Sequence, residues 1–399
     1  MYIQRGMEKN IIKASKQFPA IAVTGPRQSG KSTMLRKVFG KTHKYITFDD
    51  PIIRERAVAD PKLFFSTFED NVILDEIQYV PQITSYIKIA IDEKRNLKGR
   101  YILTGSQQFH LIKHLGDSLA GRIALFELMP FDYEEKCSLP ALKKKIFTTK
   151  DIFIHSCMRS SYPQPNIESK IDINNWISGY FQTYLERDIK SIFDIGNLRD
   201  FQRFLQLLAA RCSQILNLSA FSADLGVTVN TLKRWISVLE ASRIIYLLNP
   251  YYNNLGKRIT KAPKVYFLDC GLACYLTGIN NRETLLNSPL AGPLFENFCI
   301  QETLKQILNY QKNVRLYYIR TNNNLEIDLI IEKNGELYPC EIKFNMTPKL
   351  SDISNVERFK SIFTKLKIGE GRLISLSEET AKLKENITME PLRNLIEWI

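Results

Sequence analysis

Short runs of apolar residues alternate with helical stretches along the first third of the chain. Four of these runs are predicted to be strands, over Ala20–Thr24, Tyr45–Phe48, Val72–Leu74 and Tyr101–Thr104. They are apolar throughout, which is typical of strands that are covered on both faces of a sheet. The pattern therefore predicts an α/β domain built on a parallel sheet.

Helical patterns replace this alternation after about residue 131, and strand patterns return in the last third of the chain. Residues 176–250 read as helical, and a long helix is predicted over Pro293–Tyr310. Later strands are predicted at Val265–Leu268, Arg315–Ile319, Leu325–Glu332 and Leu337–Phe344. We therefore expect three domains, namely an α/β domain over residues 1–135, a helical region over 136–260 and an α+β domain over 261–399.

The composition is typical of a globular protein rather than a disordered chain. Of the 399 residues, 44% are apolar, which is enough to form buried cores. No apolar run reaches the roughly 18 residues of a membrane span, so no membrane partner is expected. The first residues lack the apolar core of a secretory signal. Seven scattered cysteines without a CxxC pair argue against a disulfide framework, so we expect a reduced, cytoplasmic protein.

The positive charge is concentrated near the N-terminus. The formal net charge is +13, and residues 1–150 carry 25 basic and 16 acidic side chains. A basic region suits a polyanionic partner such as a nucleotide, DNA or RNA, although net charge also simply keeps proteins in solution.

A phosphate-binding loop is predicted directly after the first strand. Residues 25–32 read Gly-Pro-Arg-Gln-Ser-Gly-Lys-Ser, which fits the pattern GxxxxGK[ST] between a strand and a helix. In such a loop the glycines let backbone N–H groups turn toward phosphates, and the helix N-terminus adds partial positive charge. Lys31 is expected to reach the β- and γ-phosphates of ATP, and the Ser32 hydroxyl to ligate Mg²⁺. The residues expected to bind the nucleotide are Gly25, Pro26, Arg27, Gln28, Ser29, Gly30, Lys31, Ser32 and Thr33.

The strand at residues 72–74 runs into two acids, Asp75 and Glu76. After a phosphate loop, the first acid is expected to hold Mg²⁺ through water and the second to activate the attacking water. Standing alone, the segment would more simply be a strand followed by a solvated acidic turn. Ser106, after the fourth strand, is placed to sense the γ-phosphate, although an ordinary turn at a strand end explains it nearly as well.

Several motifs in this order resemble the AAA-type ATPases of the archaeal-ATPase-like group. They are Gly-Pro-Arg-Gln-Ser-Gly-Lys-Ser-Thr from residue 25, Leu-Asp-Glu-Ile-Gln from 74, Leu-Thr-Gly-Ser from 103, Leu-Ala-Gly-Arg from 119, Tyr-Phe-Leu-Asp-Cys-Gly-Leu from 266 and Leu-Phe-Glu-Asn from 294. The resemblance covers nearly the whole chain. It implies an AAA-type P-loop ATPase domain, a winged-helix segment and a C-terminal domain similar to restriction-endonuclease-like nucleases.

Arg122 is the candidate arginine finger of such an ATPase. It would stabilise transition-state charge from a neighbouring subunit, which implies self-association through the ATPase domain. The alternative is a surface arginine that pairs with Asp117 or Glu127.

A helix-turn-helix is predicted in the helical region, with Gly226 in the turn and Thr228 as the cap of the second helix. Its buried stripe would consist of Leu232, Trp235, Ile236 and Leu239. The outward residues Asn230, Thr231, Lys233 and Arg234 have the composition that contacts nucleic acid. Residues 244–249 and 264–268 would form the wing. Such domains also serve only to pack or to bind protein, and that alternative stays open.

Residues 325–344 predict a β-hairpin around Asn334-Gly335, a pair that selects a two-residue type I′ turn. The turn sets Asp328 opposite Glu341, and strand alternation puts Lys343 on the same face. Two carboxylates across a ladder repel each other, so one carboxyl pKa should rise unless a cation sits between them. Pro339 has no N–H to donate, which predicts an edge position or a bulge.

Asp328 followed by Glu341-Ile-Lys343 reads as the D…ExK signature of restriction-endonuclease-like folds, and Glu296 matches an additional acid of that pattern. There the acids bind Mg²⁺ and the lysine positions or activates the attacking water. The alternative is a structural remnant in which Lys343 only neutralises the acids.

The sequence thus favours a Mg²⁺-dependent ATPase that acts on a nucleic-acid or protein target. One rival is a nucleotide-gated binding module with negligible turnover, and another is a metal-dependent nuclease with an accessory ATPase domain. Glu76, as a candidate general base, favours turnover.

Overall fold

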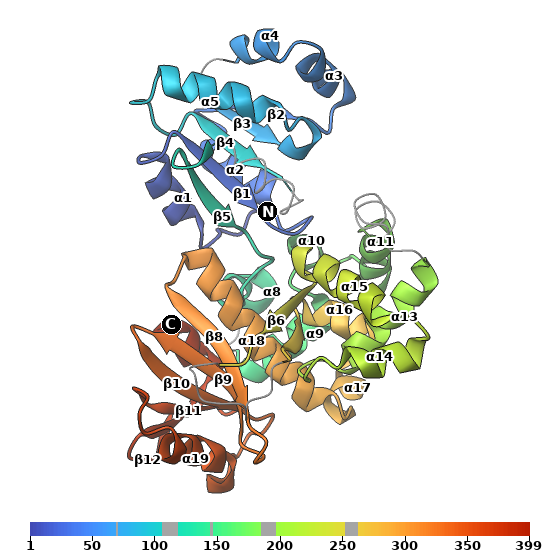
Figure 1. Ribbon diagram of the computed structural model, residues 1–399, viewed down its shortest axis with the longest axis vertical. Helices are drawn as coiled ribbons and strands as arrows, with labels where there is room; N and C mark the ends of the chain where they lie inside the picture. The colour runs from blue at the N-terminus through green and yellow to red at the C-terminus, as the bar shows by residue number, and fades with distance from the viewer. Residues whose placement is uncertain (69–70, 106–118, 144–146, 185–196, 252–261) are drawn as a thin grey trace. The chain divides into compact units, whose positions relative to one another are not determined.

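The computed structural model describes residues 1–68, 71–105, 119–143, 147–184, 197–251 and 262–399 (Figure 1). Ser106, predicted to sense the γ-phosphate, lies outside these residues. The chain forms two compact units. The first contains residues 1–135, 162–164 and 308–311, and the second contains residues 136–161, 165–307 and 312–399. The boundary near residue 260, predicted between a middle and a C-terminal domain, lies within the second unit.

The first unit is built on a five-stranded parallel sheet of order β2-β3-β4-β1-β5. Its elements are α1 (Glu8–Ser15), β1 (Ala20–Thr24), α2 (Lys31–Phe39), β2 (Lys44–Thr47), α3 (Pro51–Ala59), α4 (Pro61–Ser66), β3 (Val72–Asp75), a 3₁₀ turn (Ile77–Tyr79), α5 (Ile83–Glu93), β4 (Tyr101–Thr104) and β5 (Ile123–Glu127). The four predicted strands are confirmed to within one residue at each end. The edge strand β5 was not predicted.

Alternate residues of the central strand β1 enter two separate cores. Ala20 and Ala22 pack with side chains of α3, α4 and α5 on one face of the sheet. Ile21 and Val23 pack with side chains of α1 and α2 on the other face. The prediction of strands covered on both faces is therefore confirmed for β1, β3 and β4, whose residues are all buried, and is wrong for the edge strand β2, where only Ile46 is buried. Because all five strands are parallel, their carboxyl ends lie along one edge, and the loop after β1 lies at that edge.

The second unit holds a group of helices followed by a mixed sheet. Its elements, some of whose end residues belong to the first unit, are α7 (Tyr133–Cys137), α8 (Pro140–Lys143), α9 (Thr149–Arg159), α10 (Pro163–Ile167), α11 (Ile173–Tyr184), α13 (Leu198–Ala210), α14 (Leu218–Leu225), α15 (Val229–Ala241), β6 (Ile245–Leu248), β7 (Lys264–Phe267), α16 (Cys270–Leu276), α17 (Arg282–Asn287), α18 (Ala291–Tyr310), β8 (Val314–Arg320), β9 (Glu326–Lys333), β10 (Glu336–Ile342), a 3₁₀ turn (Leu350–Ile353), α19 (Ser354–Ile362), β11 (Gly371–Ser375), β12 (Ala381–Lys384), β13 (Ile387–Pro391) and α20 (Leu392–Trp398).

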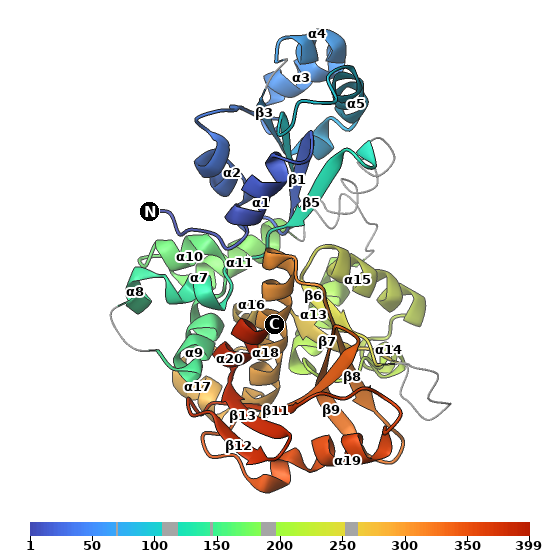
Figure 2. The same ribbon diagram turned by 90° about the vertical axis from the view of Figure 1, so that its left-hand side faces the viewer.

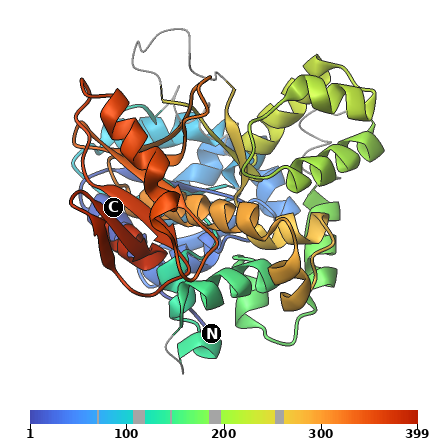
Figure 3. The same ribbon diagram turned by 90° about the horizontal axis from the view of Figure 1, so that it is seen from below.

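Helices α13, α14 and α15 pack around an aromatic core, and they form the yellow-green group in Figure 3. The ring of Trp235 lies 5.3 Å from that of Phe201 and 5.5 Å from that of Phe204. The predicted turn is confirmed: Gly226 caps α14 with a φ of 71°, and the Thr228 side chain accepts a hydrogen bond from the N–H of Thr231. The four residues of the predicted stripe on α15 are buried. Strands β6 and β7 then pair antiparallel, as predicted for the wing segments.

The C-terminal sheet has six strands in the order β12-β13-β11-β10-β9-β8. Figure 2 shows α19 beside this sheet, where it packs against β9 and β10. The predicted hairpin register is confirmed, since Lys333 pairs with Glu336 and Leu329 with Cys340. Asn334 and Gly335 have φ values of 55° and 78°, as the type I′ turn requires. Strands β11, β12 and β13 were not predicted.

Of the two expectations for Pro339, the edge position is wrong, whereas the pairing beside it is irregular: Leu337 bridges to Ile368 and Cys340 pairs with Arg372, so three steps along β10 face four on the neighbouring segment. Strand β10 lies inside the sheet, and its pairing with β9 runs through Pro339 and Ile330 without a shift. On the other side of β10, Leu337 bonds to the irregular segment at Lys367, and the ladder with β11 begins only at Cys340. Pro339 thus lies between these two sets of hydrogen bonds. Its lack of an N–H therefore costs the sheet no hydrogen bond at this position.

Among the described residues, no helix combines the length and the apolar character that crossing a bilayer would require.

Candidate functional site

The predicted phosphate loop joins the carboxyl end of β1 to the first turn of α2 in the first unit. Gly25 has a φ of 137°, and a Cβ atom there would lie 2.2 Å from the carbonyl oxygen of Leu128. Gly30 has a φ of 93°, in the left-handed region that only glycine adopts freely. The hydroxyl of Ser29 is buried and has no hydrogen-bond partner within the part of the chain that the structure describes. These features fit a backbone cradle that a ligand completes.

Lys31, the first residue of α2, is 5% exposed and lies over the loop. Its Nζ donates hydrogen bonds to the carbonyl oxygens of Gly25 and Pro26, at 3.0 and 2.8 Å. Burial lowers the pKa of Lys31 to about 8, because the nearby charges of Glu76 and Asp75 compensate only in part. A buried ammonium held by neutral carbonyls favours the arrival of an anion.

Asp75 and Ser32, the two predicted Mg²⁺ ligands, come together beside the loop. The hydroxyls of Tyr45 and Ser32 both hydrogen-bond to the Asp75 carboxylate. Burial raises the pKa of Asp75, and these two hydrogen bonds oppose the rise. A hydroxyl and a carboxylate are the oxygen ligands that Mg²⁺ accepts in nucleotide sites. The residues present therefore fit this ion.

Glu76, the candidate general base, follows β3 with a φ of 54°. The left-handed backbone is uncommon for a residue with a side chain, and such strain is found at functional positions. Its carboxylate accepts a hydrogen bond from the Gln78 amide. Glu76 is half-buried.

A residue that the sequence did not suggest, Arg5, holds the phosphate loop from the N-terminal segment. Its Nη1 donates to the carbonyl oxygen of Ser29 at 2.7 Å, and its Nη2 to that of Met129 at 2.6 Å. Its Nε pairs with Glu135 at 2.9 Å, and the arginine is 3% exposed. Nothing in the short segment before α1 signals this role, since Arg5 and Glu135 are 130 residues apart.

Arg122, the candidate arginine finger, lies at the opposite edge of the sheet from the phosphate loop. Its carbonyl oxygen accepts a hydrogen bond from the N–H of Ala20, the first residue of β1, whereas the loop follows the last residue of that strand. Its guanidinium makes two hydrogen bonds to Asp92 on α5, at 2.8 and 3.0 Å. Asp117, an expected partner, lies outside the described residues.

The second unit presents the residues predicted for nucleic-acid contact along α15. Asn230, Lys233 and Arg234 are exposed, and Thr231 is half-buried. The exposed and buried positions therefore separate as the helical periodicity predicts.

The candidate acidic face lies on the C-terminal sheet, where β9 and β10 bring Asp328, Glu341 and Lys343 together. Lys343 Nζ lies 2.7 Å from Glu341 and 3.7 Å from Asp328. Burial and the charge of Asp328 raise the pKa of Glu341 well above its usual value. The predicted rise of one carboxyl pKa is confirmed, although burial rather than repulsion is the larger cause. Glu341 Oε1 is buried and has no hydrogen-bond partner among the described residues.

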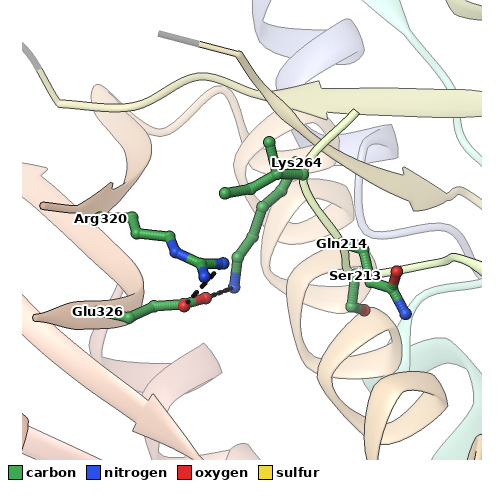
Figure 4. Close-up of a pocket in the computed structure, with 6 residues that line it drawn as sticks. Ser213, Gln214, Lys264, Arg320 and Glu326 are labelled. Atoms are coloured by element: carbon green, nitrogen blue, oxygen red, sulfur yellow. Dashed lines mark ion pairs between the residues drawn. The ribbon is translucent and has the colours of Figure 1, made fainter. Parts of the chain in front are cut away.

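Lys264, the first residue of β7, enters this acidic face from the two-stranded sheet. Its Nζ lies 2.8 Å from Glu326, 3.1 Å from Glu296 and 3.6 Å from Asp328. Figure 4 shows its contact with Glu326 beside a cavity of about 310 Å³. Burial would lower the pKa of Lys264, but the acids, Glu296 first among them, raise it well above its usual value.

Glu296 approaches from α18, as predicted, and has two partners on β7. Tyr266 donates a hydrogen bond to Glu296 Oε1 at 2.6 Å, and Lys264 pairs with the same oxygen. Burial raises the pKa of Glu296 to about 7, against the lowering effect of Lys264. The only sequence signal for this arrangement is strand alternation, which places Lys264 and Tyr266 on one face of β7.

No group of three or more His, Cys, Asp or Glu side chains arranged to hold a metal ion occurs in the described ranges. The acids of the C-terminal sheet are near one another, but ammonium groups lie among them. Their arrangement therefore does not fit the metal that the restriction-endonuclease-like resemblance implies.

Comparisons with known proteins agree with these observations in part. An uncharacterized protein of Mycobacterium tuberculosis is 28% identical over 395 residues, covering 98% of this chain and 84% of that protein. An uncharacterized protein of Methanocaldococcus jannaschii is 23% identical over 413 residues, covering 94% and 86%. Among solved structures, the Walker-type ATPase of Pyrococcus abyssi has a TM-score of 0.46 at 16% identity, covering 69% of this chain and 96% of that one.

Three family models match successive parts of the chain. Residues 150–283 and 291–395 match models described as domains of unknown function, DUF8612 and DUF4143. Residues 17–137 match a model described as an AAA domain. The five strands of the parallel sheet and the residues of the predicted phosphate loop lie inside the AAA-domain match.

Proposed function

We propose that the first unit binds ATP with Mg²⁺ and hydrolyses it, and that the cycle drives action of the second unit on a nucleic-acid or protein target. The observation that carries this proposal is Lys31, a buried ammonium that donates hydrogen bonds to loop carbonyls at the carboxyl edge of a parallel sheet. The triphosphate of ATP supplies more negative charge than the nearby Glu76 and Asp75 provide.

Each residue of the site has a separate task in this proposal. The backbone of residues 25–30 and Lys31 bind the phosphates, and Ser32 and Asp75 hold Mg²⁺. The ion, when bound, neutralises charge on the phosphates and on the leaving group. Glu76 accepts the proton of the attacking water. Tyr45, which hydrogen-bonds to Asp75, keeps that carboxylate in position.

Two substitutions test this proposal. Lys31→Ala should abolish ATP binding, because the phosphates lose their buried cation. Glu76→Gln should keep ATP binding and slow turnover about 100-fold or more, because water loses its proton acceptor. Equilibrium binding and phosphate release are measured on the full chain, with Glu93→Gln, an exposed residue of α5, as the matched control. Turnover by Glu76→Gln at the original rate would refute the assignment of the base, and negligible turnover in the unsubstituted protein would favour the nucleotide-gated binding module.

We further propose that hydrolysis requires contact between copies of the chain, with Arg122 as the arginine finger. A strand of five residues spans about 16 Å, so Arg122 at the far edge of β1 is better placed for another copy's nucleotide than for its own. Its ion pair with Asp92 would have to open for this role. Mixing Arg122→Ala with Lys31→Ala protein should restore part of the lost turnover, since each supplies what the other lacks. Turnover per chain that stays constant on dilution to the monomer would contradict this.

For the second unit we propose a winged-helix segment, formed by α14, α15, β6 and β7, that contacts nucleic acid through the exposed face of α15. The exposed cations Lys233 and Arg234 beside Asn230 support this assignment. We also propose a restriction-endonuclease-like fold for the C-terminal sheet, supported by the order of its acids along β9 and β10. We do not extend this to metal-dependent cleavage, because Lys264, a cation outside that signature, lies among the acids.

A further inference from the structure

Lys264 occupies a particular place among the acids of the C-terminal sheet. Its ammonium lies within 3.6 Å of Glu296 on α18 and of Asp328 on β9, and it also contacts Glu326. A divalent ion that bridged Glu296 and Asp328 would have to sit in the same space, because its oxygen ligands must approach to about 2.1–2.5 Å. The lysine is 2% exposed, so it is not a mobile surface side chain.

Without a metal, the cations of the cluster already offset most of its negative charge. Four carboxylates, those of Glu296, Glu326, Asp328 and Glu341, face three cations, which are Lys264, Lys343 and Arg320. A divalent ion added to this set would leave an excess of positive charge. Removal of the Lys264 charge makes this set more negative by one unit, which favours the binding of another cation.

We propose that Lys264 is the resident cation of this site and excludes a divalent metal from it. The ammonium relieves the electrostatic repulsion among the acids, as a bound metal ion does in restriction-endonuclease-like folds. It also fastens β7 to α18 and to the C-terminal sheet by ionic contacts. This inference goes beyond the proposed ATPase and does not depend on it.

A lack of space beside the cluster does not explain why a divalent metal ion is excluded from it. The cavity of about 310 Å³ is lined by Lys264 and Glu326 together with Ser213, Gln214, Ile215 and Arg320 (Figure 4). The cavity therefore borders the cluster at Lys264 and Glu326. The side chain of Lys343 does not take over the role, because its contacts are with Glu341 and Asp328 and it is 37% exposed.

The experiment measures Mn²⁺ binding by calorimetry and by the electron paramagnetic resonance of free Mn²⁺. All proteins are full-length and carry Lys31→Ala, without nucleotide, so that the phosphate loop does not contribute. The parent protein should show no Mn²⁺ site that depends on Asp328. Adding Lys264→Met should create one Mn²⁺ site per chain, with binding at least about ten-fold tighter, since a unit charge within 4 Å of the ligands is gone. Asp328→Asn in that protein should abolish the site.

Two control variants distinguish the effect of the position of Lys264 from the effect of its charge on Mn²⁺ binding. Lys343→Met removes a charge from the same cluster but leaves Lys264 in place, and it should create no site. Lys264→Arg keeps the charge and should behave as the parent. A Mn²⁺ site in the parent that Asp328→Asn removes would overturn the proposal, and so would a folded Lys264→Met protein that binds no Mn²⁺.

If the Lys264→Met protein does not fold, the proposal is tested on the parent protein and its Asp328→Asn variant. A melting temperature of the parent that Mn²⁺ leaves unchanged, together with no binding that depends on Asp328, supports exclusion. A rise in the parent's melting temperature with Mn²⁺ that Asp328→Asn abolishes contradicts it.

Discussion

The phosphate loop and the acidic face of the C-terminal sheet both bury a lysine beside carboxylates, yet the two lysines are in opposite electrostatic states. Lys31 is bonded to neutral carbonyls, and burial lowers its pKa to about 8. Lys264 is bonded to three carboxylates, which raise its pKa despite its burial. At the first site the charges of Glu76 and Asp75 offset the burial of the lysine only in part, whereas at the second site the acids more than offset it.

This contrast shows that a buried lysine near acids does not by itself indicate a binding site. At the phosphate loop the hydrogen-bond partners of the side chain are neutral carbonyl oxygens, those of Gly25 and Pro26. On the C-terminal sheet the partners are full charges within 3.6 Å, so a new ligand would have to break ion pairs that are largely out of water. Whether a buried lysine is available to a ligand depends on the charge of the groups that it contacts, not on its burial.

The largest expected effect concerns the free energy of unfolding, which should respond in opposite ways to the replacement of Lys264 and of Lys31. Lys264→Met should cost about 3–5 kcal/mol of the second unit's free energy of unfolding, because it leaves buried carboxylates without their cation. Lys31→Met should leave the first unit equally stable or stabilise it by up to about 3 kcal/mol, because a pKa lowered from 10.5 to about 8 means that the ammonium opposes folding below pH 8. Calorimetric unfolding without nucleotide measures both.

Lys343→Met is the control for that comparison. Its side chain is 37% exposed, against 3% for Lys264, so its loss should cost less than the loss of Lys264. Equal losses of stability in the Lys31 and Lys264 variants would mean that the two sites do not differ as described.

A second expected effect concerns the pH dependence of ATP binding. Below pH 8 Lys31 is already protonated, whereas above pH 8 it must take up a proton to meet the phosphates, whose charge raises its pKa. ATP affinity should therefore fall as pH rises above about 8, by at most about ten-fold per pH unit. Binding heats at pH 7 and pH 9, in two buffers with different ionisation enthalpies, count the protons taken up. Heats at pH 9 that do not depend on the buffer would contradict this.

The smallest expected effect is at α15, where the cations are exposed. Replacing Lys233 and Arg234 together with alanine should weaken nucleic-acid binding and lower the slope of log affinity against log salt by about one to two. Binding of a fluorescent duplex across a salt series gives the slope. The matched control replaces Lys365 and Lys367, two exposed lysines elsewhere in the second unit. An unchanged slope in the α15 variant would leave this helix as a packing or protein-binding element.

Short-range patterns predicted much of the fold correctly. The strands of the first unit, the turn at Gly226 and the hairpin register around Asn334-Gly335 all follow from signals within a few residues. Such signals work because backbone conformation and side-chain periodicity are local properties. Strands β5, β11, β12 and β13 were missed. Of these, β5 and β12 are edge strands, whose formation depends on the neighbour they pair with.

The sequence by itself determined the phosphate loop and its acids, because the spacing of Gly25, Gly30 and Lys31 dictates the chemistry they can perform. It also determined that Asp328 and Glu341 share a face. Only the tertiary structure decided how these groups are partnered. Arg5 reaches the loop at Ser29, and Lys264 reaches acids on α18 and β9, across long stretches of chain. Ion pairing and burial depend on distance in space, and no local pattern records which distant side chain arrives.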